Sequence, residues 1–139
     1  MTTSSASAHA PRAVVAGHGT FADGVISAVA CICGRGDAFL AVTNEGCTGP
    51  GVEDAIRTAL AAHGATVVFT DLPAGSCTMA ARRIARTDPL VAVVTGATVA
   101  MLLEFALGSG EAAADLERAA GRGREAITVH PPTGAPDGA

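Results

Sequence analysis

The sequence predicts an α/β fold with an open, mostly parallel, doubly wound sheet of four strands plus a short C-terminal strand. Short apolar runs rich in Val and Ala alternate with longer segments whose apolar residues recur at helical spacing. Glycine or proline separates most runs from the next. Near-continuous apolar strands that alternate with helices require a parallel sheet covered by helices on both faces.

The expected elements follow the order βαβαβαβα and end with a short strand. A helix over residues 21–33 has apolar side chains three and four positions apart, and Gly34 follows its last turn as a stop signal. Gly64 similarly ends a helix over residues 52–63. Strands are expected over residues 12–16, 37–43, 65–70, 89–95 and 125–129, and further helices over 76–84, 98–107 and 111–122.

Length and composition indicate one domain, which we place at residues 12–129, between a disordered N-terminal arm (1–11) and a disordered tail (130–139). The formal net charge is −4, all nine basic residues are arginine, and the only aromatic residues are four Phe. A nucleic-acid-binding domain needs a basic surface and stacking side chains, so the composition argues against this function.

Three further expectations concern the location of the protein, its cysteines and metal binding. Residues 1–11 lack a secretory signal, and the apolar run at 90–103 is polar-interrupted and too short for a bilayer span of about 20 residues, so we expect a cytoplasmic protein. The four cysteines are expected to be small buried hydrophobes. The four scattered histidines do not form a metal site, so no metal, no cofactor and no metal-dependent hydrolase is expected.

The first candidate functional stretch runs from Ala13 to Gly24. His18 stands between Gly17 and Gly19, directly after the first strand and before the first helix. Ligands bind at the carboxyl ends of strands in open α/β sheets. If the second and third strands flank the first, the strand order reverses between the first and third strands, which is the topological switch point of the sheet. His18 then lies at this point, next to the residue that follows the third strand.

That residue is Asp71, in the second stretch, Thr66 to Thr78. Asp71 can accept a hydrogen bond from one ring nitrogen of His18 and leave the other as a nucleophile. The backbone N–H groups of Gly75, Ser76 and Cys77 at a helix N-terminus, with the hydroxyls of Ser76 and Thr78, can hold a phosphate-sized anion.

Each stretch alone also fits a plain turn, with His18 or Asp71 as a capping residue. Together they favour a histidine that accepts and passes on a phosphoryl group. The chain has no Gly-x-Ser-x-Gly nucleophile elbow and no Walker loop, which argues against a serine hydrolase and a nucleotide-binding protein.

Three blocks of the chain resemble the IIA component of the mannose/fructose/N-acetylgalactosamine class of the bacterial sugar phosphotransferase system (PTS). They are His18-Gly19-x-Phe21-Ala22-x-Gly24, Asp71-Leu72-Pro73-x-Gly75-Ser76, and Thr95-Gly96 followed by Met101-Leu102-Leu103-Glu104. The resemblance covers about residues 12–129. Family members often have Gly-Gly where this chain has Ala74-Gly75, and Leu72-Pro73 is more similar to the galactosamine branch.

The resemblance implies that His18 accepts a phosphoryl group from phospho-HPr and passes it to a IIB subunit, which phosphorylates a sugar entering through membrane subunits IIC and IID. Asp71 then matches the residue that orients the imidazole, and Ser76 a hydroxyl near the phosphoryl group. Phe21, Leu72 and Pro73 flank the site and are candidate partner-docking residues. A homodimer that exchanges the last strand, residues 125–129, is also implied.

Two alternatives share this fold. One is a phosphoryl donor for dihydroxyacetone phosphorylation, whose relatives have Ser-His-Ser in the first block. The other is a regulatory module that uses phosphorylation of His18 only as a signal. The sequence identifies neither the sugar nor the phosphorylated ring nitrogen.

Overall fold

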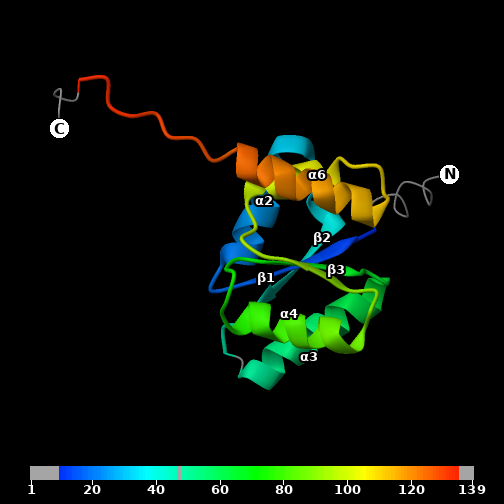
Figure 1. The fold of residues 1–139 in the computed structure, drawn as a ribbon. Helices are drawn as coiled ribbons and strands as arrows, with labels where there is room; N and C mark the ends of the chain where they lie inside the picture. The colour runs from blue at the N-terminus through cyan, green and yellow to red at the C-terminus, as the bar shows by residue number, and fades with distance from the viewer. Residues whose placement is uncertain (1–9, 47, 135–139) are drawn as a thin grey trace.

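The computed structural model describes residues 10–46 and 48–134 (Figure 1). The predicted arm over residues 1–11 therefore lies almost wholly outside the described residues, as do the last five residues of the tail. The elements are β1 (Ala13–Gly17), α2 (Phe21–Cys33), the 3₁₀ helix η1 (Gly36–Ala38), β2 (Phe39–Thr43), α3 (Gly49–His63), β3 (Val67–Thr70), α4 (Ser76–Thr87), β4 (Ala92–Val94), α5 (Val99–Ala106) and α6 (Ala112–Glu125).

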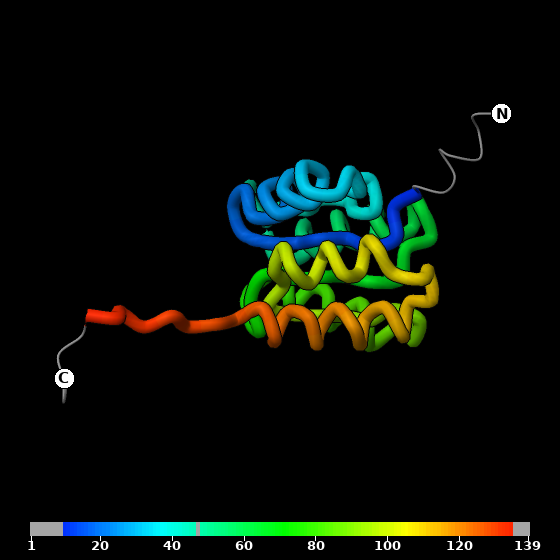
Figure 2. The backbone as a smooth tube through the Cα atoms, turned by 90° about the horizontal axis from the view of Figure 1, so that it is seen from above, coloured from blue at the N-terminus to red at the C-terminus, as the bar shows by residue number. Residues whose placement is uncertain are grey.

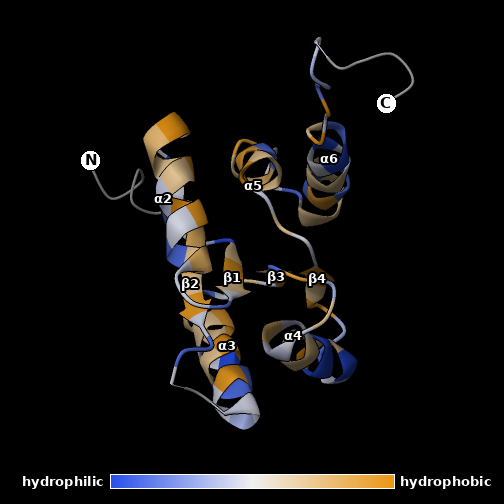
Figure 3. Ribbon diagram, turned by 90° about the vertical axis from the view of Figure 1, so that its left-hand side faces the viewer, coloured by the Kyte–Doolittle hydropathy of each residue, from blue (hydrophilic) through white to orange (hydrophobic). Residues whose placement is uncertain are grey.

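The four strands form one parallel sheet in the order β2-β1-β3-β4, which confirms the predicted α/β fold. The second and third strands flank the first, as the switch point requires. Helices α3 and α4 cover one face of the sheet, and α2, α5 and α6 cover the other (Figure 3). Figure 2 shows the C-terminal residues running away from this body.

The alternation of side chains along β1 divides the core between the two faces. Ala13 and Val15 belong to the cluster under α2 and α5, whereas Val14 and Ala16 belong to the cluster under α3 and α4. The first cluster contains three phenylalanines with ring centroids 5.2 to 6.2 Å apart, namely Phe39, Phe69 and Phe105. The second is built from aliphatic side chains and Cys77.

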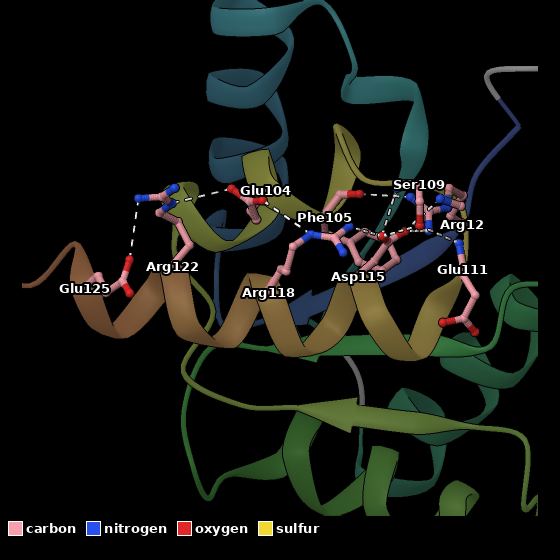
Figure 4. A network of polar contacts seen from close by, with 10 residues as sticks. Arg12, Glu104, Phe105, Ser109, Glu111, Asp115, Arg118, Arg122 and Glu125 are labelled. Carbon is pink, nitrogen blue, oxygen red and sulfur yellow. Dashed lines mark hydrogen bonds and ion pairs between the residues drawn. The ribbon is translucent and has the colours of Figure 1, made fainter.

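A buried ion pair ties the start of β1 to the α5–α6 corner (Figure 4). The Asp115 carboxylate is fully buried and accepts hydrogen bonds from Arg12 at 2.6 Å, from the N–H of Ser109 at 2.9 Å and from the N–H of Gly110 at 2.9 Å. Burial raises the pKa of Asp115, but these donors outweigh burial and hold the pKa far below its ordinary range. The resulting contribution to folding stability is complete above the ordinary aspartate pKa and is lost progressively as the pH falls from there through the lowered pKa of the folded state.

The predicted last strand does not form in the single chain, which corrects the expectation for residues 125–129. Helix α6 continues to Glu125, and the described residues after it have no regular structure. Ile127 is 75% exposed and Val129 is 84% exposed. These residues leave the body of the domain and meet no strand of their own chain that would pair with them.

Three smaller differences have local causes. Helix α3 begins three residues earlier than predicted, because Thr48 Oγ1 caps it by accepting from the N–H of Gly51. The strand expected from residue 37 begins at Phe39, after the η1 turn. Cys31 is exposed, contrary to expectation, whereas Cys77 is buried as predicted; Cys47 lies outside the described residues.

No helix in the part of the chain that the structure describes is long and apolar enough to cross a membrane.

Candidate functional site

The candidate site lies where β1 and β3 end side by side. Parallel pairing places Ala16 opposite Thr70, so the residues just beyond these strands meet at the same edge of the sheet. Gly17 ends β1 and must lack a side chain, because a Cβ there would lie 2.6 Å from Phe21 Cδ2 and 3.1 Å from Asp71 Oδ2. His18 and Asp71 are thereby brought together, as the sequence predicts.

One carboxylate oxygen of Asp71 contacts both the backbone and the ring of His18. Asp71 Oδ2 accepts the backbone N–H of His18 at 2.8 Å and lies 2.8 Å from His18 Nδ1. A carboxylate can only accept from the ring, so Nδ1 carries the hydrogen when the neutral ring makes this bond, and the lone pair is on Nε2. The His18 side chain is 45% exposed and that of Asp71 only 11%, so the ring nitrogen that carries the lone pair belongs to the more exposed partner.

Asp71 is negatively charged in this arrangement. Burial raises the pKa of its carboxyl group, but the hydrogen bonds from the backbone N–H and the ring of His18 outweigh burial and lower the pKa below the ordinary value. The other oxygen, Oδ1, is buried and accepts no hydrogen bond from the described residues. His18 is therefore the hydrogen-bond donor on which this carboxylate depends.

Gly75 brings the backbone against the outer edge of the ring. Its φ is +130°, and a Cβ there would lie 3.2 Å from His18 Cε1 and 3.8 Å from Nε2. The residue is the N-cap of α4, whose first helical hydrogen bond runs from the N–H of Met79 to the Gly75 carbonyl. The N–H groups of the first turn precede that bond and favour an anion in front of Nε2.

The four predicted phosphoryl-binding residues have different placements. Gly75 and Ser76 are half-buried, and Gly75 lies against the His18 ring. The side chain of Cys77 is fully buried in the core, which leaves only its backbone N–H for a ligand. The hydroxyl of Thr78 is buried and contacts Thr70 Oγ1 at 2.7 Å and the Leu72 carbonyl at 2.5 Å, so it supports the loop from beneath.

The three predicted docking residues differ in how exposed they are. Leu72 is 50% exposed and Pro73 is exposed, so both present apolar surface beside His18. Phe21 is half-buried and packs against the core cluster under α2 and α5. Leu72 and Pro73 are thus the exposed apolar residues of this set, and we call them the Leu72–Pro73 rim.

The end of β2 contributes contacts that the sequence reading missed. Thr43 Oγ1 donates to the Gly19 carbonyl at 2.9 Å, and the N–H of Asn44 donates to the Gly17 carbonyl at 3.3 Å. Asn44 Nδ2 also donates to Ser76 Oγ at 3.4 Å. The available signal was positional: Thr43 ends β2 and Asn44 directly follows it, and β2 neighbours β1 at the edge of the sheet where ligands bind.

Among residues 10–46 and 48–134, no three His, Cys, Asp or Glu side chains gather as a metal site would require. The pair of His18 and Asp71, with the N-terminus of α4 beside it, is an arrangement that can support attack by His18 Nε2 on an anionic group.

Comparison with known proteins gives a family and a fold. Residues 12–120 match the family model described as PTS system fructose IIA component. No curated protein matches the chain. An EIIA phosphotransferase component from Streptococcus agalactiae superposes with a TM-score of 0.78 at 19% identity, covering 85% of this chain and 95% of that one.

Two further solved structures are similar. A mannose/sorbose-specific IIA subunit from Enterococcus faecalis has a TM-score of 0.75 at 22% identity, covering 91% of this chain and 99% of the other. A IIA protein associated with the fucose utilization operon of Streptococcus pneumoniae has a TM-score of 0.73 at 21% identity, covering 86% and 93%. At these identities the superpositions establish the fold.

The approach of Gly75 to the ring generates a prediction. Gly75→Ala places a side chain at a φ that only glycine adopts readily, which costs about 1–3 kcal/mol of unfolding free energy, and pushes the new methyl group against His18. Urea denaturation measures the first effect, and the NMR resonances of the His18 ring report the second.

Gly24→Ala is the matched control, because Gly24 is an exposed helical position where a Cβ meets nothing within 4 Å. It should be neutral or stabilising by about 0.5–1 kcal/mol. Unchanged stability and ring resonances in Gly75→Ala would contradict the geometry.

Proposed function

Because the chain belongs to the family of PTS system fructose IIA components, we propose that it carries a phosphoryl group on His18, received from phospho-HPr and passed to a IIB subunit. The transfer takes place in the cytoplasm and serves sugar uptake through membrane subunits IIC and IID. The observation that carries this proposal is the 2.8 Å contact between Asp71 Oδ2 and His18 Nδ1, which leaves Nε2 as the free nucleophile beside the N-terminus of α4.

The proposed transfer proceeds by direct displacement. The Nε2 lone pair attacks phosphorus, the bond between phosphorus and the donor breaks, and the donor leaves with that electron pair. The Nδ1–H stays hydrogen-bonded to Asp71 throughout, so no proton has to leave the ring. The second transfer repeats the displacement, with the nucleophile of IIB attacking phosphorus and Nε2 as the leaving group.

Charge explains why Asp71 holds the far nitrogen. Two unit negative charges 4 Å apart repel by about 4 kcal/mol at an effective dielectric of 20. Contact through Nδ1 places the imidazole ring between the carboxylate and a phosphoryl group on Nε2. The first turn of α4 offsets the remaining repulsion by about 0.3–1 kcal/mol for each favourable interaction with the anion.

The donor and the acceptor have to reach the same nitrogen. The exposed Leu72 and Pro73, with Phe21 behind them, are the apolar surface on which we propose that both proteins dock in turn. Because the sugar does not meet this subunit in such a relay, its identity is not encoded in the site.

The first test is intact mass after incubation with phosphoenolpyruvate, enzyme I and HPr. The parent should gain one acid-labile phosphoryl group, and His18→Ala should gain none. If the parent gains no mass while the donors phosphorylate a control IIA protein, the proposal is wrong. Phosphorylation on His18 without transfer to any IIB would favour the regulatory alternative.

The second test uses Asp71→Asn. The neutral amide no longer selects the Nδ1–H tautomer or stabilises positive charge on the ring, so transfer should slow by more than tenfold while the affinity for HPr changes less than twofold. Rapid-quench transfer rates and titration calorimetry with HPr measure the two quantities. Equal transfer rates in variant and parent would contradict the proposal that Asp71 orients the ring.

We also propose a homodimer in which residues 125–129 of each chain pair with the partner. In the single chain β4 is an edge strand of the sheet, and the exposed Ile127 and Val129 alternate as strand residues do. Analytical ultracentrifugation should find a dimer for the full chain and a monomer for a chain ending at Glu125. A full chain that is monomeric at the concentrations used for transfer contradicts this assembly.

A further inference from the structure

We propose that Asn44 is a positioning residue for phosphoryl transfer, because its side-chain amide fixes the Ser76 hydroxyl so that the hydroxyl hydrogen faces the group on His18 Nε2. The inference rests on the proposed function and adds the residue that directly follows β2 (Phe39–Thr43), a strand that contributes neither His18 nor the α4 N-terminus. Its starting point is the contact between Asn44 Nδ2 and Ser76 Oγ at 3.4 Å, which joins positions 32 residues apart in the sequence.

The backbone around Asn44 is held independently of its side chain. Its N–H donates to the Gly17 carbonyl at 3.3 Å, next to His18. The Thr43 hydroxyl donates to the Gly19 carbonyl at 2.9 Å and accepts the N–H of Glu45 at 3.1 Å. The carbonyls on both sides of His18 are thus bound by the end of β2, which leaves the Asn44 amide to act across the site.

The chemistry of the two groups restricts the direction of the Ser76 O–H bond, because the hydrogen has to point away from the Asn44 amide. The amide NH₂ of Asn44 only donates, so it occupies a lone pair of Ser76 Oγ. A hydroxyl has one hydrogen, which is then available to another acceptor. The neighbouring acceptor during transfer is the phosphoryl group, because Ser76 lies in the first turn of α4, next to the residue that contacts the imidazole edge.

The contact between Asn44 and Ser76 should lower the energy of the transition state only when the phosphoryl group is present. A hydroxyl that is already aimed need not reorient as charge develops on the transferring oxygens, which is how preorganised donors accelerate reactions. The amide should therefore affect the rate of transfer, not the docking of HPr or IIB, whose contact surface is the Leu72–Pro73 rim.

A double-mutant cycle on single-turnover transfer from phospho-HPr tests the inference. Asn44→Ala should slow transfer about fivefold, the loss expected of one neutral hydrogen bond, and should cause no further loss in a Ser76→Ala background. Asn44→Asp, which keeps the size of the side chain, should be slower than Asn44→Ala, because its carboxylate accepts the Ser76 hydrogen and repels the phosphoryl group. The affinity for HPr should be unchanged in Asn44→Ala.

Thr48→Ala is the control for loosening the same loop, since it removes only the N-cap of α3. It should leave the transfer rate at the parent value. A parent rate in both Asn44→Ala and Asn44→Asp overturns the inference, and so does an equal loss with and without Ser76, which would mean that the amide acts by another route. Failure of the proposed function gives a different result, because the parent itself then receives no phosphoryl group on His18. That result would contradict both proposals.

Discussion

The site depends on one atom, Asp71 Oδ2, which accepts both the backbone N–H and the ring Nδ1 of His18. The first contact fixes the turn and the second fixes the ring, so the imidazole cannot rotate without losing a partner. Both require β1 and β3 to be neighbours in register, and both require Gly17 to lack a side chain. The doubly wound sheet is thus the means by which two residues 53 positions apart become a hydrogen-bonded pair.

Much of this arrangement could be predicted because it follows from local pattern and strand topology. The helix over residues 21–33 has the predicted bounds, since its apolar spacing and stop signal are both local. The meeting of His18 and Asp71 follows from parallel strands that end at one edge. The start of α3 was less accessible, because the capping Thr48 is separated from the apolar residues by glycines and a proline.

What could not be predicted depends on side-chain direction and on partners. The contact of Asn44 with Ser76 requires the relative placement of β2 and α4, which no local pattern gives. Thr78 has the residue type of an anion ligand, but the third position of α4 points inward, where its hydroxyl meets Thr70 and the Leu72 carbonyl. Residues 125–129 have the alternation of a strand, yet in the single chain they form none and pair with no other strand.

The anion site that we propose consists mostly of the backbone at Gly75 and the first turn of α4, and this has a consequence for divergence. A peptide N–H is present whichever residue other than proline occupies a position, so most substitutions leave it in place even though they change the side chain. The solved structures described above keep the fold at about one-fifth identity. Remote homologues are therefore better sought by two glycines, one histidine and one aspartate at fixed topological positions than by overall resemblance.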